Sequence, residues 1–173
     1  MKRLLLLRHA RSTPAVNGHD DYDRSLTASG EADAARIGDF LAFEGLTPEL
    51  IVSSSARRAL ETARLVASRW RDAAEPSAEL ALYDASRLLI LARLHALPDD
   101  AASALIVGHN PGIGESASWL AGEGDPTARM QIAARYPTSG LSVLAFDCAS
   151  WREIAPRAGR LERFVSPADL DAP

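Results

Sequence analysis

The sequence predicts a single α/β domain in which helices and strands form layers, and three observations support this prediction. Short apolar runs typical of strands alternate with longer segments whose apolar residues recur at helical spacing. Residues 4–7 are four consecutive leucines, as expected for a strand that is buried on both faces of a sheet. The 173 residues are enough for one domain with a substantial core and too few for two.

Two strands and two helices are predicted in the first half of the chain, with boundaries set by capping residues. Thr27 is an expected N-cap, and Gly45 ends the helix that Thr27 opens. Ser54 or Ser55 is expected to cap the next helix. In order, the predicted elements are a strand over residues 4–7, a polar loop over 13–24 at the mouth of the sheet, a helix over 28–44, a strand over 50–52 and a helix over 56–70.

The second half is predicted to continue this alternation. Ser86 or Asp84 is expected to cap a leucine-rich helix. Asn110 and Pro111 begin another helix, because proline suits the first helical position. The predicted elements are an extended piece over residues 79–83, a helix ending near 95, a strand over 104–107, a helix through 120, an irregular loop over 122–137, a strand over 140–147, a strand over 151–155 that pairs with it as a hairpin, and a weakly ordered tail from about 156.

Composition and charge exclude several classes of function. The net charge is -4, and no basic run interleaved with aromatic residues is present, so we expect no nucleic-acid partner. The leucine run is too short for a signal peptide and no segment is long enough to span a bilayer, so we expect no membrane association. The single cysteine, Cys148, cannot form an internal disulfide, which fits a reducing compartment, and the cytoplasm is the expected location.

Two of the four histidines stand at the ends of predicted strands. His9 follows the leucine run, with Arg8 beside it, and His109 follows the strand over residues 104–107. Ligands of α/β sheets bind beyond the carboxyl ends of the strands. If the two strands are parallel neighbours, both imidazoles project into one cleft. The alternative is that both are ordinary turn histidines.

Arg58 lies in the first turn of the predicted helix over residues 56–70, where the helix dipole and free backbone N–H groups favour an anion. A cation is unfavourable there by roughly a few tenths of a kcal/mol, so its presence is explained if it faces a bound anion. The alternative is a solvated basic face shared with Arg57, Arg64 and Arg69. Two arginines and two histidines together describe a phosphate pocket with a nucleophile, because guanidinium groups match phosphate oxygens and neutral imidazole can attack phosphorus.

Arg8-His9-Ala10 resembles the Arg-His-Gly signature of the histidine phosphatase superfamily, and in particular the Arg-His-Ala variant found in its short SixA-type phosphohistidine phosphatases. Each further motif is weakly specific alone, but the ordered set is strong and spans residue 4 to about 147. The further motifs are residues 24–30, 54–63, 79–83, 107–112 and 137–140. The resemblance implies a three-layer α/β/α sandwich with a mostly parallel central sheet, similar to phosphoglycerate mutase. It also implies a phosphatase that acts on phosphohistidine in proteins or on a small phosphomonoester.

The resemblance also implies roles for particular residues. His9 would be the nucleophile that becomes transiently phosphorylated, and Arg8, Arg58 and His109 would hold the phosphoryl group. Ser12 stands where the wider superfamily often has threonine, and is expected to add a hydroxyl contact. No cofactor and no metal are expected, because the arginines neutralise the phosphate and the sequence offers no clustered carboxylates or cysteines.

Glu79 and Asp84 are the candidates for a general acid that protonates the leaving group. Alternatively, Asp84 caps the following helix and Glu79 is merely exposed. A phosphohistidine leaves as imidazole, a leaving group that needs no dedicated acid once it is protonated. The expected partner is a phosphorylated protein, such as a histidine phosphotransfer domain, or a small phosphorylated metabolite. Two rival functions stay open, a phosphoglycerate mutase-type phosphotransferase and a non-catalytic module that binds phosphoproteins. Whether the loops over 13–22 and 122–137 cover the cleft also stays open.

Overall fold

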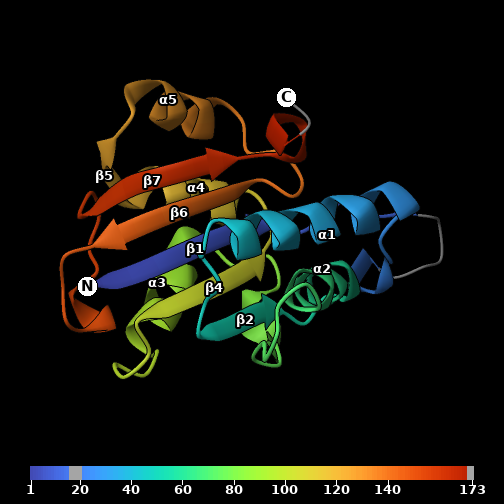
Figure 1. Ribbon diagram of the computed structural model, residues 1–173, viewed down its shortest axis with the longest axis horizontal. Coiled ribbons are helices and arrows are strands. Elements are labelled where there is room, and N and C mark those ends of the chain that lie inside the picture. Colours follow the sequence, from blue (N-terminus) through green and yellow to red (C-terminus); the bar gives the residue numbers. More distant parts are fainter. Residues whose placement is uncertain (16–20, 171–173) are drawn as a thin grey trace.

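A seven-stranded sheet forms the centre of the computed structural model, which describes residues 1–15 and 21–170 (Figure 1). The strands lie in the order β3-β2-β4-β1-β6-β7-β5, and β6 is the one strand of the described chain that runs opposite to β1. The strands are β1 (Lys2–Arg8), β2 (Leu50–Ser54), β3 (Ser77–Glu79), β4 (Ser103–Gly108), β5 (Ala121–Gly124), β6 (Leu141–Phe146) and β7 (Gly159–Val165). The prediction of a mostly parallel central sheet is confirmed.

β1 lies next to β4, and their parallel pairing brings the ends of both strands together. The register pairs Arg8 with Gly108. The next residue on each strand is a histidine, so His9 and His109 leave the sheet side by side at its carboxyl edge. The backbone N–H of His9 donates to the Gly108 carbonyl oxygen at 3.0 Å and extends the ladder by one bond.

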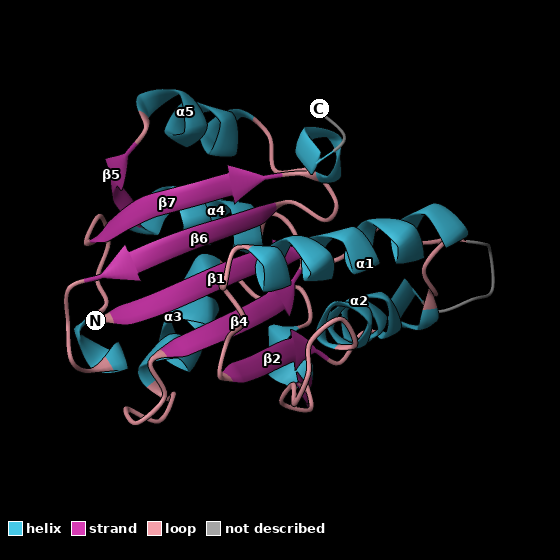
Figure 2. Cartoon of the chain, viewed as in Figure 1, coloured by secondary structure: helices cyan, strands magenta, loops and turns pink. Residues whose placement is uncertain are grey.

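Helices cover both faces of the sheet and produce the three predicted layers (Figure 2). One face carries α1 (Ala28–Phe43) and α2 (Arg57–Ala67), and the other carries α3 (Arg87–His95), α4 (Gly112–Leu120) and α5 (Pro126–Ala134). The leucines of β1 alternate between the two cores, with residues 4 and 6 on the α3–α4 side and residues 5 and 7 on the α1–α2 side. Full burial of one leucine stabilises a fold by roughly 1.5–3 kcal/mol, so the leucines of β1 stabilise the packing of the helices on both faces of the sheet. None of the helices in the described residues is long and apolar enough to cross a membrane.

Two predicted helix caps are confirmed. The Thr27 hydroxyl accepts the Gly30 N–H at 3.1 Å and begins α1. Ser86, rather than Asp84, caps α3. At the start of α4 the cap residue is Pro111, while the side chain of the preceding asparagine accepts a backbone N–H four residues further on.

The prediction that Ser54 or Ser55 caps α2 is wrong. β2 continues through Ser54, and the residue before the helix is Ala56, which makes no side-chain cap bond. The Ser54 hydroxyl faces the end of β4 instead and bonds to the His109 ring at 2.8 Å. The serines therefore end β2 rather than begin a helix, because Ser54 bonds to the residue that directly follows the neighbouring strand β4.

The C-terminal part of the chain is more ordered than the sequence predicts. Residues 159–165 form β7, which pairs antiparallel with β6, so the prediction of a weakly ordered tail is wrong there. The predicted hairpin strand over 151–155 is also wrong, because Trp151–Glu153 forms a 3-10 helix. β7 has three charged residues and only two buried ones, Gly159 and Leu161, so its sequence resembles a polar surface segment rather than a strand.

The irregular loop predicted over residues 122–137 is wrong as well, because β5 and α5 occupy most of it. Asp125 begins α5 by accepting the Ala128 N–H at 2.8 Å, and Pro126 follows at the first helical position. Asp-Pro before an apolar-periodic stretch is a helix start signal that the sequence does contain. Part of the other candidate lid, residues 16–20 of the stretch 13–22, lies outside the described residues.

Candidate active site

His9 is buried at the carboxyl end of β1, and its partners fix one tautomer of the neutral ring. Nδ1 lies 2.8 Å from the Ala10 carbonyl oxygen, which can only accept, so Nδ1 carries the proton. Nε2 lies 3.3 Å from Nε of Arg58, which can only donate, so Nε2 presents its lone pair. A neutral imidazole in this state is a nucleophile at Nε2.

The backbone around His9 is held from two sides. The Ala10 N–H donates to the Thr62 hydroxyl at 3.0 Å, and that hydroxyl donates to the Arg58 carbonyl oxygen at 2.6 Å. On the other side, the Ser139 N–H donates to the His9 carbonyl oxygen at 3.2 Å. The His9–Ala10 peptide, which directly precedes the carbonyl that fixes the imidazole, is therefore tied both to α2 and to the segment that precedes β6.

Arg58 links the two imidazoles. Its side chain is 5% exposed, and Nη2 lies 3.3 Å from Nδ1 of His109 while Nε donates to His9. The two ring centroids are 5.2 Å apart. Because Nδ1 of His109 faces a donor, its neutral ring carries the proton on Nε2, which donates to the Ser54 hydroxyl. The structure thus brings His9, His109 and Arg58 into one cluster.

A carboxylate that the sequence analysis treated as part of a polar loop completes this cluster. Asp21 Oδ2 accepts from Arg58 Nη2 at 3.0 Å and from the Tyr83 hydroxyl at 2.9 Å, and its backbone carbonyl oxygen accepts from Arg58 Nη1 at 2.6 Å. Arg24 lies 3.0 Å from Oδ1. Partial burial opposes ionisation of Asp21, but the Tyr83 hydroxyl and the two arginines outweigh it and lower its pKa. The sequence carries no local signal for this residue, because the burial of Arg58, which creates the need for a counter-charge, is a result of the fold.

We expect Asp21→Asn to lower kcat about tenfold, because the guanidinium of Arg58 loses the charged partner that fixes its orientation. The matched control is Asp23→Asn, which removes an equal charge two residues away where the side chain is exposed. Steady-state kinetics on p-nitrophenyl phosphate measure both variants. Equal rates for the two variants would show that Asp21 does not position Arg58.

Burial keeps both histidines neutral. The pKa of His9 is lowered to about 3, chiefly by burial. The bond to the Ala10 carbonyl acts in the opposite direction, and the charges of His109, Arg58 and Arg8 add to the lowering. Burial, followed by the charge of Arg58, lowers the pKa of His109 to about 4. At neutral pH the pocket therefore offers a lone pair rather than a cation at His9.

The pH dependence of stability follows from these shifts. Between about pH 6.5 and pH 4 the unfolded chain binds protons on both histidines and the folded chain does not. The free energy of unfolding is therefore expected to fall as the pH drops through this window, by up to about 1.4 kcal/mol per pH unit for each histidine. NMR titration of the imidazole resonances, with urea unfolding at pH 7, 6 and 5, measures both quantities. Titration of both rings near pH 6.5 would contradict the expected neutral pair.

Arg8 and Ser12 lie near the cluster with partners of their own. Arg8 donates from Nη1 to the Tyr136 carbonyl oxygen at 2.9 Å, and its positive charge acts on both histidines. The Ser12 hydroxyl accepts a hydrogen bond from Arg24, the same arginine that pairs with Asp21. Ser12 thus supports the carboxylate behind Arg58.

The two candidate acids differ in their surroundings. Both oxygens of Glu79 accept from Arg93 of α3 at 2.7–2.9 Å, and this ion pair uses the oxygens that a proton donor needs free. Asp84 is exposed, and its charge is near enough to His109 to oppose the lowering of that pKa. Within residues 1–15 and 21–170, no group of three or more His, Cys, Asp or Glu side chains could hold a metal ion.

The fold and the cluster define a class of protein: an α/β protein in which two neutral imidazoles and a buried guanidinium lie together at the carboxyl ends of adjacent parallel strands. Residues 4–88 match the model of the histidine phosphatase superfamily (branch 1). A chloroplastic protein of Arabidopsis thaliana is 31% identical, over 96% of this chain and 78% of that protein.

Two solved structures named SixA are similar over nearly their whole length. The SixA of Agrobacterium tumefaciens superposes with a TM-score of 0.81 and 29% identity, covering 96% of this chain and 98% of that one. The SixA of Nakamurella multipartitia gives a TM-score of 0.83 and 27% identity, covering 96% of each chain. The chain belongs to the histidine phosphatase superfamily, in its SixA-type branch.

Proposed function

We propose that this protein is a phosphatase that transfers the phosphoryl group of its substrate to Nε2 of His9 and then to water. The observation that carries the proposal is the lone pair of Nε2, fixed by the Ala10 carbonyl on one side and by Arg58 on the other. In the first step the Nε2–phosphorus bond forms as the bond from phosphorus to the leaving group breaks. In the second, water attacks phosphorus, loses a proton, and releases the imidazole and inorganic phosphate.

Arg8, Arg58 and His109 hold the phosphoryl oxygens in this proposal. Guanidinium donors fixed before the substrate arrives stabilise the charge that develops on those oxygens, which is usually the largest contribution to catalysis. Nδ1 of His109 has a lone pair in the free protein, and the approach of a phosphate dianion raises its affinity for a proton. In this proposal His109 becomes a third cationic donor, beside Arg8 and Arg58, only when the phosphoryl group is bound.

The leaving group determines whether an acid is needed. The leaving group of a phosphohistidine is imidazole, whereas that of a phosphomonoester is an alkoxide, which takes a proton in the transition state. For an ester we assign that proton to Asp84, because Glu79 is engaged by Arg93. The substrate is a phosphorylated protein, such as a histidine phosphotransfer domain, or a small phosphorylated metabolite, and the reaction needs no metal ion.

The test is hydrolysis of p-nitrophenyl phosphate and of a phosphohistidine peptide in the presence of EDTA. Turnover of either compound, with a phosphorylated protein trapped by rapid quenching at alkaline pH, is the expected result. Turnover that EDTA abolishes contradicts metal independence. Isomerisation of a phosphoglycerate primed by 2,3-bisphosphoglycerate would indicate the mutase-type phosphotransferase instead. Binding of phosphopeptides without turnover would indicate the docking module.

A further inference from the structure

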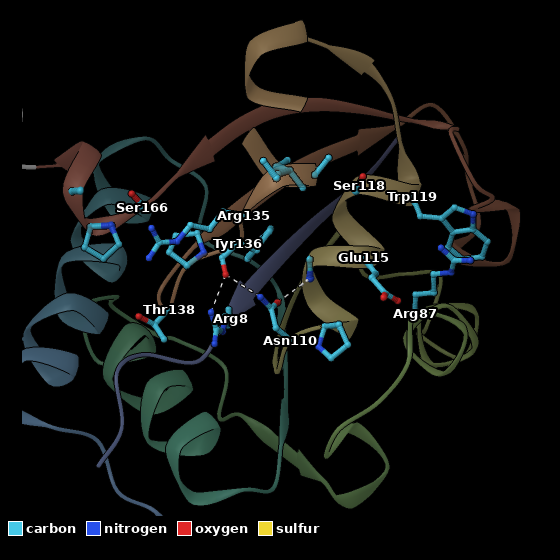
Figure 3. A pocket seen from close by; sticks show the side chains of 18 of the residues that line it. Arg8, Arg87, Asn110, Glu115, Ser118, Trp119, Arg135, Tyr136, Thr138 and Ser166 are labelled. Atoms are coloured by element: carbon cyan, nitrogen blue, oxygen red, sulfur yellow. Dashed lines mark hydrogen bonds between the residues drawn. The ribbon is translucent and has the colours of Figure 1, made fainter. Parts of the chain in front are cut away.

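A groove of about 920 Å³ has Arg8, the residue directly before His9, in its lining (Figure 3). Its walls come from α4, from residues 132–138 and from residues 166–168. Trp119, with Arg87 packed 4.9 Å above the centre of its ring, lies on the side of the groove away from Arg135. Small-molecule sites have volumes of roughly 300–1,000 Å³, so the groove has the size of one.

The groove collects arginines that have no carboxylate partner. Five arginines line it, and within the described chain none of the five forms an ion pair: Arg8, Arg11, Arg87, Arg135 and Arg157. The lining contains two carboxylates, Asp33, which lies 3.6 Å from Arg36, and Glu115. The groove is therefore positive on a chain whose net charge is -4.

The positive charge is concentrated next to the active site. Arg135 directly follows α5 and lies on the same side of the groove as Arg8 (Figure 3). Burial, and then the charge of Arg135, lower the pKa of Arg8, so the two guanidinium groups are near enough to repel each other. Nε of Arg8 is buried and has no hydrogen-bond partner among the described residues. An anion between the two groups would remove the repulsion and use donors that now lack partners.

We propose that this groove binds the leaving group of a small phosphorylated substrate and selects leaving groups that carry a second anionic group, held by Arg135 and Arg11. The inference rests on the proposed function, since it takes the phosphoryl group to lie at His9. Arg8 is adjacent to His9 in the chain and also lines the groove, and its Nη1 is fixed by the Tyr136 carbonyl oxygen. The phosphoryl group and the second anion would thus lie on either side of one anchored guanidinium. The recognised chemistry is a carboxylate or a second phosphate.

The experiment compares two substrates that differ in one charge, 4-carboxyphenyl phosphate and 4-carbamoylphenyl phosphate. We expect wild type to prefer the carboxylate by at least about fivefold in kcat/KM, and Arg135→Gln to lose that preference while retaining turnover of the neutral compound. Dividing the ratio for the variant by the ratio for wild type cancels the difference between the two phenols as leaving groups. The matched control is Arg129→Gln, which removes the same charge from α5 but outside this groove, and it should keep the preference.

The outcomes separate the groove from the proposed function. Turnover of the neutral compound tests the phosphatase, whereas the ratio of the two compounds tests the groove. If neither compound is turned over, calorimetric binding of the same pair to the protein still measures the preference. The same ratio in wild type and Arg135→Gln overturns the proposal. So does a preference for acidic residues that appears with phosphorylated proteins and is absent from the small pair, because the groove would then be a protein-docking surface.

Discussion

His9→Ala is expected to reduce phosphatase activity on the order of 10⁴-fold or more and to abolish the phosphorylated protein trapped at alkaline pH. The reason is chemical: in the proposed reaction Nε2 of His9 carries the lone pair that attacks phosphorus, and the contacts with Ala10 and Arg58 fix the ring in the tautomer that has it. Quenched-flow labelling with a radioactive phosphoryl donor measures the intermediate, and steady-state assays measure turnover. The labelled intermediate and the turnover should both be lost in this variant.

The control for this variant is His95→Gln. His95 ends α3 and bonds to the Ile154 carbonyl oxygen at 2.8 Å, so it belongs to a different part of the fold. Its replacement should leave the labelled intermediate intact. A labelled protein that survives in His9→Ala would place the nucleophile elsewhere and remove the basis of the proposed reaction.

Arg58→Ala is expected to lower kcat/KM by about 100- to 1,000-fold, equivalent to about 2.7–4 kcal/mol, as for removal of one fixed oxyanion donor. This side chain contacts both imidazoles and Asp21, so its loss removes a charge and also loosens the orientation of His9. Arg58→Lys should recover little of the activity, because an ammonium group lacks the planar fork that spans these partners. Steady-state kinetics, with thermal unfolding to confirm that the variants fold, measure the effect.

Arg57→Ala is the matched control, since it removes the same charge one residue earlier. The Arg57 side chain is 56% exposed and pairs with Glu61 at 2.7 Å, four residues further along α2. Exposed pairs of this kind contribute about 0–1 kcal/mol to stability, so little change is expected in either activity or unfolding temperature. Comparable losses of activity in both variants would mean that the general positive field of α2, rather than the geometry of Arg58, supports the reaction.

Local sequence features were sufficient to predict the central strands and the two histidines. Four consecutive leucines require a strand buried on both faces, and a polar residue directly after such a strand lies at the ligand-binding edge. The family resemblance added the three-layer arrangement. The sequence did not predict β7, because three of its seven residues are charged and it therefore resembles a polar tail. α5 does have a local signal, since Asp125 and Pro126 form a cap followed by proline at the first helical position.

Residues that act through contacts across the chain were beyond the reach of local pattern. Asp21 and Tyr83 are 62 positions apart, and both meet Arg58 only when the chain folds. Serine is common at helix caps, so the sequence predicts a cap at Ser54, but its partner is the ring of His109, the residue that directly follows β4. Such roles depend on contacts between residues far apart in the chain, and local sequence patterns do not reveal those contacts.

The spacing of the two rings is set by the backbone ladder between β1 and β4, because the His9 N–H and the Gly108 carbonyl form part of that ladder. Segments in the middle of a sheet open to solvent only when the whole domain melts, whereas short surface turns fray at much lower cost. The pair of imidazoles should therefore persist through every partial opening that leaves the sheet intact. The turn that carries Asp21 is a short 3-10 helix, Asp21–Asp23, with no buried residue, so we expect it to open at a lower free-energy cost than the β1–β4 ladder and to release Arg58 while the two imidazoles stay in place.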